Sequence, residues 1–231
     1  IKMNNTKIEV LFEDNHLIII NKQPGELTQG DITKDQTLGD KVKLYIKKKY
    51  NKPGDVFLGI THRLDRPTSG LIIFSKTSKA LSRLNEMFKN NEIKKTYWAI
   101  VKKIPENEKR KLENHLLKNQ KQNKSYVTNS SNKKAKKAIL YYESILNLEN
   151  YSLLKIKLET GRHHQIRTQL SYIGMPIKGG LKNGFSRPNS DGSIHLHSRM
   201  INFTHPVSKK QIKIIANPPK NKIWNLCLNM R

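Results

Sequence analysis

Short apolar runs with the two-residue alternation of β-strands recur along this chain from end to end. The first two, residues 8–12 and 17–22, flank Glu13-Asp14-Asn15-His16, a pattern typical of a hairpin. Such runs restrict the chain to folds in which a sheet carries most of the core. We expect further strands at residues 70–76, 94–102, 138–147, 151–159, 194–204 and 211–216.

Helical spacing is less frequent and does not alternate regularly with the strands. We expect helices at residues 37–51, from 77 or 78 to about 88, at about 163–173, and after Pro218-Pro219. This order predicts an α+β fold with a mostly antiparallel mixed sheet and flanking helices. No linker divides the chain, so we expect a single domain over residues 7–231, and residues 1–6 are left out of the fold prediction.

The charge balance points to a polyanionic partner. The chain has 44 Lys and Arg against 18 Asp and Glu, a formal net charge of +26. Nucleic acid is the first candidate, because each neutralised phosphate releases counterions; an anionic membrane is the second. Biased coding explains Lys in place of Arg, but not the shortage of acids. Residues 102–137 hold twelve of the cations and three acids, and form either a solvated loop or part of the nucleic-acid surface.

The cell compartment is predicted from what the sequence lacks. Cys227 is the single cysteine, so no intramolecular disulfide can form. No apolar run approaches the ~20 residues that span a bilayer, and the start has no signal-peptide pattern. We therefore expect a cytoplasmic protein with no membrane partner.

Residues 62–70 read HRLDRPTSG, with Asp65 between Arg63 and Arg66. Neighbouring guanidinium groups favour the charged form of a carboxyl group. That suits a carboxylate acting as a nucleophile or as an electrostatic partner. The alternative is an ordinary surface ion pair.

Two more stretches carry candidate site residues. In TGRHHQIRTQL (160–170), a helix places His164 and Arg167 on one face, from which Arg167 could reach a carboxylate supplied elsewhere; ordinary surface cations are the alternative. In KKTYWA (94–99), Tyr97 offers a flat ring for stacking on a base, although a strand tyrosine is more often plain core. Strand alternation sends Tyr97 and Trp98 to opposite faces.

The sequence lacks the residue patterns that metal binding, nucleotide hydrolysis and other hydrolytic reactions require. His195 and His197 share a strand face, but no spacing matches a zinc site, so we expect no metal. The Gly-rich stretch at residues 179–184 lacks the ending of a phosphate loop, which leaves nucleotide hydrolysis unsupported. No Gly-x-Ser-x-Gly elbow is present, and a conventional glycosidase needs a second carboxylate.

Taken together, these stretches resemble the RluA family of pseudouridine synthases. HRLDRPTSGL (62–71) is similar to the family's HRLDxxTSGL signature, and GRHHQIR (161–167) to its GRTHQIR. NKQPG (21–25), KTYWA (95–99) and LH (196–197) followed by FTHP (203–206) fall in the family's order. The matches extend over residues 8–219. The chain departs from the pattern at His163, at Thr168-Gln169 and at Gly179-Gly180, where the family has Thr or Ser, Val-His and Gly-Asp.

The resemblance implies the pseudouridine synthase fold with a central catalytic cleft, and the isomerisation of uridine in RNA without a cofactor. Asp65 would attack the sugar or the base, or abstract a proton. Tyr97 would stack on the target uracil, Arg167 would pair with Asp65, and Arg63 would fill the space of the flipped nucleotide. Further RNA contacts are expected from Arg66, Arg162 and His164.

The resemblance leaves the RNA open: ribosomal RNA, transfer RNA or both. We expect a monomer consisting of the catalytic domain without the family's S4 domain. The rival hypothesis is an RNA-binding or ribosome assembly factor on the same fold with weak or secondary modification activity. The loops at 102–137 and 181–193 are where the family's members differ in target.

Overall fold

The computed structural model describes residues 7–30 and 35–230, so the residues set aside at the start lie outside it. The strands of this part are β1 (Val10–Glu13), β2 (Leu17–Lys22), β3 (Gly59–Ile60), β4 (Ser69–Ser75), β5 (Lys94–Lys102), β6 (Lys109–Asn119), β7 (Lys124–Thr128), β8 (Lys136–Asn147), β9 (Tyr151–Leu158), β10 (Leu196–Thr204) and β11 (Gln211–Ile215). They form one sheet in the order β1-β2-β4-β10-β5-β9-β8-β6-β7, with β11 beside β10 and β3 beside β4. Among these described strands, only β4 and β10 pair in parallel.

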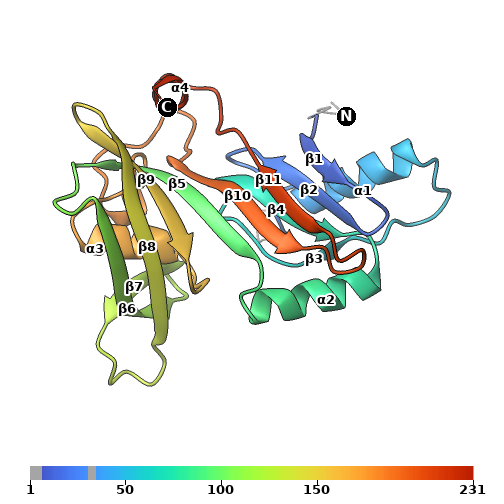
Figure 1. Cartoon of the computed structure of the whole chain (residues 1–231), viewed down its shortest axis with the longest axis horizontal. Helices are drawn as coiled ribbons and strands as arrows, with labels where there is room; N and C mark the ends of the chain where they lie inside the picture. The colour runs from blue at the N-terminus through green and yellow to red at the C-terminus, as the bar shows by residue number, and fades with distance from the viewer. Residues whose placement is uncertain (1–6, 31–34, 231) are drawn as a thin grey trace.

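Helices lie against this sheet at several places (Figure 1). They are α1 (Leu38–Lys49), α2 (Ser78–Lys89), α3 (Gln165–Tyr172), α4 (Lys222–Asn229) and the single 3-10 turn η1 (Leu181–Asn183). Figure 1 shows α1 near β1 and β2, and α3 at the opposite end of the molecule beside β6 to β9. The predicted α+β class, with a mostly antiparallel mixed sheet and flanking helices, is confirmed.

The first two helices begin where capping side chains predict. Thr37 accepts a hydrogen bond from the Asp40 backbone N–H, and Asp40 accepts one from the Thr37 backbone N–H. Thr77 accepts from Ala80 in the same way at the start of α2. Each threonine satisfies an N–H group that has no partner within the helix.

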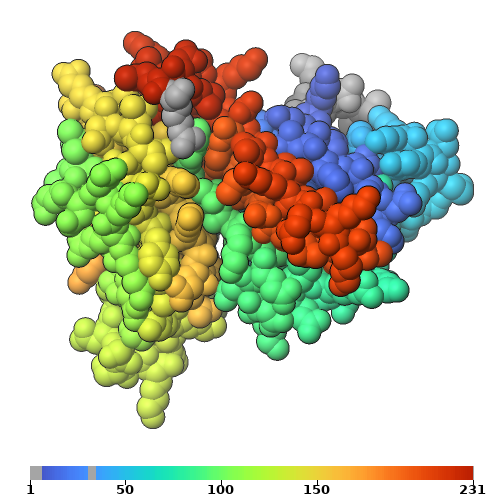
Figure 2. All heavy atoms as spheres, in the orientation of Figure 1, coloured from blue at the N-terminus to red at the C-terminus, as the bar shows by residue number. Residues whose placement is uncertain are grey.

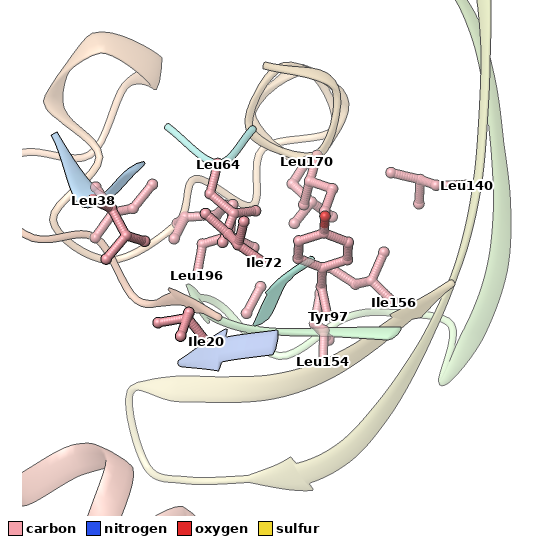
Figure 3. Close-up of a cluster of buried hydrophobic side chains, with 14 of the residues drawn as sticks. Ile20, Leu38, Leu64, Ile72, Tyr97, Leu140, Leu154, Ile156, Leu170 and Leu196 are labelled. Carbon is pink, nitrogen blue, oxygen red and sulfur yellow. The ribbon is translucent and has the colours of Figure 1, made fainter. Parts of the chain in front are cut away.

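The largest cluster of buried apolar side chains joins α1, the centre of the sheet and α3 (Figure 3). Tyr97 of β5 belongs to it, whereas its neighbour Trp98 packs with Trp224 of α4 in a separate cluster. The predicted opposite orientations of these two rings are therefore confirmed. Figure 3 shows the Tyr97 hydroxyl directed toward Leu170 of α3, away from the strand.

The parallel pairing of β4 with β10 depends on Gly70. Its φ of 112° lies where residues with a side chain are strained, and a Cβ there would lie 2.4 Å from the Ser198 carbonyl oxygen. No side chain fits at that distance, so β4 and β10 can approach only with glycine at this position. The contact fixes the start of β4 at Ser69, four residues after Asp65.

Residues 102–137 contain β6 and β7, so the expectation of a loop there was wrong. Leu112 and Leu116 point to one face and are buried, and these two apolar anchors suffice because β6 pairs along its length with β8. Composition could not show this pairing, since the hydrogen bonds come from the backbone. The turn between β7 and β8 projects beyond the body of the molecule (Figure 2).

None of the helices in the described part of the chain is both long and apolar enough to cross a membrane.

Candidate active site

A cavity of about 90 Å³ opens where β5, the loop before β4 and the start of α3 meet. Segments that are far apart in the sequence supply its walls. It is lined by Arg63, Leu64, Asp65, Thr68, Tyr97, Leu158, Arg162, His164, Gln165, Ile166, Arg167 and Leu196. Six of the seven residues proposed from the sequence thus meet in one place.

Asp65 is held by two side chains of the α3 region. Arg167 Nη1 donates to Asp65 Oδ2 at 2.9 Å, and His164 Nε2 lies 3.3 Å from the same oxygen. The Arg167 side chain is buried, whereas Asp65 keeps 31% of its side-chain surface exposed. A rigid, desolvated cation therefore positions a carboxylate that remains open to the cavity.

His164 reaches Asp65 because it does not belong to the helix. The helix predicted at about 163–173 is confirmed, with its first residue at Gln165: His164 is the N-cap, with a left-handed φ of 52°. This conformation is strained for a residue with a side chain, and such strain is typical of functional sites. Burial lowers the pKa of His164, although the Asp65 charge opposes the shift, so the ring is neutral near pH 7. Its Nε2 also lies 3.3 Å from Arg167 Nη1, from which it accepts a hydrogen bond in the tautomer that carries the proton on Nδ1.

Tyr97 forms part of the cavity floor and is 7% exposed. Burial, together with the charge of Asp65, raises the pKa of its hydroxyl to about 12. The hydroxyl is therefore protonated at neutral pH and can donate a hydrogen bond. Its ring offers an apolar face to the cavity.

The loop that carries Asp65 is fixed from below by Lys22, which sequence reasoning did not single out. Its ammonium donates to the carbonyl oxygens of Gln23, Arg66 and Thr68 at 3.0, 3.1 and 2.6 Å. Lys22 has no exposed surface, and this burial lowers its pKa to about 8. The sequence did contain a signal for this role: Lys22 is the last residue of a mostly apolar strand and belongs to the NKQPG motif.

The arginines of the HRLDRPTSG stretch have different surroundings. Arg63 is exposed and lines the cavity. Arg66 does not line it: its side chain binds the Gly25 carbonyl oxygen and pairs with Asp35 at 2.9 Å. Arg162 lines the cavity and donates to the Lys137 carbonyl oxygen. The charge partner of Asp65 is thus Arg167, 102 positions away, and not its sequence neighbour Arg66.

His163 is a second residue that sequence reasoning left without a role. Its ring stacks on His164 at 3.8 Å between centroids, with an angle of 19° between the planes. Its nitrogens lie 2.9 Å from Ser125 Oγ and 3.1 Å from Asn123 Oδ1. His163 therefore links the β6–β7 hairpin to the residues that hold Asp65. The sequence signal for this role was that a histidine stands at position 163, where the RluA family has Thr or Ser.

The other histidines have structural partners. His197 Nδ1 lies 2.9 Å from Ser69 Oγ, and His195 stacks on Trp224. No group of three or more His, Cys, Asp or Glu within residues 7–30 and 35–230 is arranged to hold a metal ion.

Comparisons with known proteins identify the family and agree with the fold. The model of the RNA pseudouridylate synthase family matches residues 16–172. The chain is 32% identical over 227 residues to a ribosomal large subunit pseudouridine synthase D of Zymomonas mobilis, covering 93% of this chain and 70% of that protein. It is 33% identical over 214 residues to a ribosomal large subunit pseudouridine synthase C of Buchnera aphidicola, covering 90% and 66%.

A solved human structure, RNA pseudouridylate synthase domain containing 4, has the same fold with a TM-score of 0.80 at 20% identity. The alignment covers 95% of this chain and 92% of the human one. This chain belongs to the RNA pseudouridylate synthase family, which is a family of isomerases, and within it to the RluA type. It spans about two thirds of the length of the bacterial relatives named above.

Proposed function

We propose that this protein isomerises specific uridines in structured RNA to pseudouridine, with Asp65 as the reacting group. In this reaction the N1–C1′ bond breaks and a C5–C1′ bond forms. C5 loses a proton and N1 gains one, so the composition of the RNA is unchanged. No water, metal or cofactor enters this balance, in keeping with a site that holds one carboxylate.

The observation that supports this proposal most directly is the way in which the Asp65 carboxylate is held. Both contacts from Arg167 and His164 fall on Oδ2, and among the described residues no donor is bonded to Oδ1. One oxygen is therefore anchored, and the other is available to react with the sugar or the base. The ion pair with Arg167 holds the carboxylate in a fixed orientation, as a reacting group requires.

The other cavity residues support the reaction. Tyr97 would stack on the flipped uracil, and its hydroxyl would assist removal of the C5 proton. Arg63 is exposed at the cavity and would fill the space that the nucleotide leaves in the RNA stack. Arg162 would bind phosphate, whereas His164 would act by orienting Asp65. Arg66 would contact RNA from outside the cavity.

The choice of substrate is based on the RNAs that the relatives modify according to their names. Two of them modify the ribosomal large subunit by name, and a third, 27% identical over 229 residues, is a tRNA pseudouridine synthase C of Pectobacterium carotovorum. We take ribosomal RNA as the first substrate and transfer RNA as the second. A monomer acting in the cytoplasm, where both RNAs are found, fits this function.

The test uses transcripts of both RNAs labelled with tritium at uridine C5. Tritium release by the wild type and none by Asp65→Ala is the expected result. Because affinity rests on phosphate contacts, we expect Asp65→Ala to bind the transcripts within about threefold of the wild type. Free uracil in the products would instead indicate a hydrolase.

The rival function, an RNA-binding or assembly factor, gives a different outcome. Such a protein would bind both transcripts tightly and release no tritium from either. Asp65→Ala would then leave every measured property unchanged.

A further inference from the structure

Lys95 is a half-buried cation whose ammonium lies beside Gly161, the residue before Arg162 of the cavity wall. It lies on β5 two residues before Tyr97, so both side chains project from the same face of the strand. The separation of their Cα atoms along a strand is about 7 Å. Lys95 therefore lies about 7 Å along β5 from Tyr97, the residue on which the base is proposed to stack.

The Lys95 ammonium has no counter-ion. None of the described residues accepts a hydrogen bond from it, and no described carboxylate lies within 4 Å of it. Its neighbours are apolar: the Phe88 ring, with its centroid 5.2 Å away, and Gly161, where a Cβ would lie 3.8 Å away. Burial lowers its pKa. A partly desolvated charge without a partner is unfavourable, so a compensating anion would stabilise it.

The residues around Lys95 belong to segments that continue into two exposed arginines. Phe88 packs against His62, which precedes Arg63, and Gly161 precedes Arg162. Burial and then the charge of Lys95 lower the pKa of His62 to about 3, so this histidine is neutral and supplies no charge. Asp65, the carboxylate of the cavity, is already paired with Arg167. An anion that reaches Lys95 would therefore meet no competing carboxylate within ion-pair distance among the described residues.

We propose that the Lys95 ammonium binds a backbone phosphate of the RNA beside the nucleotide that enters the Asp65 cavity. This inference rests on the proposed RNA substrate. It adds a phosphate subsite to the cleft and gives the uncompensated cation its partner. The Phe88 ring, over which the ammonium lies, helps to hold it in place before RNA binds.

The test compares Lys95→Met, Lys95→Arg and a matched control, Lys94→Met. Methionine keeps the unbranched stem over Phe88 without the charge. Lys94 is adjacent, exposed, on the opposite face, and bonded to the Asn91 carbonyl oxygen. All variants carry Asp65→Asn so that the RNA is not converted. The Kd for a large-subunit ribosomal RNA transcript is measured between 50 and 200 mM salt, a range in which phosphate contacts are resolved.

We expect Lys95→Met to weaken binding about tenfold at low salt and to reduce the slope of log K against log salt by about 0.7 to 0.9. Lys95→Arg should keep both quantities near the reference, and Lys94→Met should change neither. Melting temperature gives an independent check: Lys95→Met should unfold no earlier than the reference, because it removes an uncompensated charge.

Two results would overturn the subsite: an unchanged slope and Kd for Lys95→Met, or an equal loss for Lys94→Met. Failure of the proposed function is a separate observation. It would be seen as absence of tritium release by the protein with Asp65 intact, whatever the binding data show.

Discussion

Arg167 Nη1 lies 2.9 Å from Asp65 Oδ2, although the two residues are 102 positions apart in the chain. The arginine is buried in α3, and the aspartate lies in the loop before β4 that the ammonium of Lys22 fixes. The pair therefore joins a rigid helix to the loop that carries the candidate reacting group. Its geometry decides how that group faces the cavity.

Replacing Arg167 should lower turnover more than RNA affinity. In Arg167→Met, Asp65 loses both its charge partner and its orientation, so we expect tritium release to fall by about 10²- to 10³-fold. Arg167→Lys keeps the charge but not the planar fork and should recover only part of the activity. RNA binding should stay within about threefold of the wild type. Full activity of Arg167→Met would show that the pair has no role in the reaction.

Tyr97→Phe separates the ring from the hydroxyl. The ring still stacks, so RNA affinity should change by less than about threefold, whereas loss of the hydroxyl should lower turnover by about 10²-fold. Because the pKa of Tyr97 is about 12, its ionisation should produce no activity change below about pH 11. Single-turnover rates from pH 6 to pH 10 measure this. An alkaline change in the wild type that Tyr97→Phe abolishes would contradict it.

His163→Thr introduces the residue usual in the RluA family. It removes the stack on His164 and the contacts with Ser125 and Asn123 of the β6–β7 hairpin. We expect kcat to fall about fivefold to tenfold with KM nearly unchanged, because His163 acts through the residues that orient Asp65. His115→Ala, on β6 of the same hairpin, is the control and should alter neither constant. A rise in KM alone would instead place His163 in RNA binding.

Glu13 should make stability depend on pH. Although its burial works against the shift, hydrogen bonds from Lys49, Lys76 and Tyr50 lower the pKa of Glu13 to about 2 from the ordinary 4.5. A lowered carboxyl pKa stabilises the folded state above about pH 4.5, and this contribution is lost as the pH falls toward 2. Glu13→Gln should therefore lower the free energy of unfolding at pH 7 by about 2 to 3 kcal/mol.

Urea denaturation at pH 7, 4 and 3 measures this difference, which should shrink at each step. The control is Glu106→Gln, since Glu106 pairs only with exposed Lys103 and is itself 83% exposed. Its stability should match that of the wild type at all three values. An equal deficit of Glu13→Gln at pH 7 and pH 3 would show that the charge of Glu13 is not the cause.

The sequence alone determined the secondary structure where the local signal was strong. The strand at Lys94–Lys102 and the capped helix starts at Thr37 and Thr77 agree with the structure, because alternation and capping are local physics. The motifs also identified Asp65, Tyr97 and Arg167 as candidate site residues from the sequence. The strands within residues 102–137 were missed, because apolar residues are sparse there and the pairing is made by backbone groups.

Only the tertiary structure decided which charges meet. The sequence places Arg66 next to Asp65, yet Arg66 pairs with Asp35, and Arg167 reaches Asp65 from α3. The left-handed turn at His164 and the missing partner of Lys95 were likewise invisible in the chain. Residue order fixes which side chains are available, but an ion pair depends on distance and burial, and these exist only after the sheet and its helices have packed.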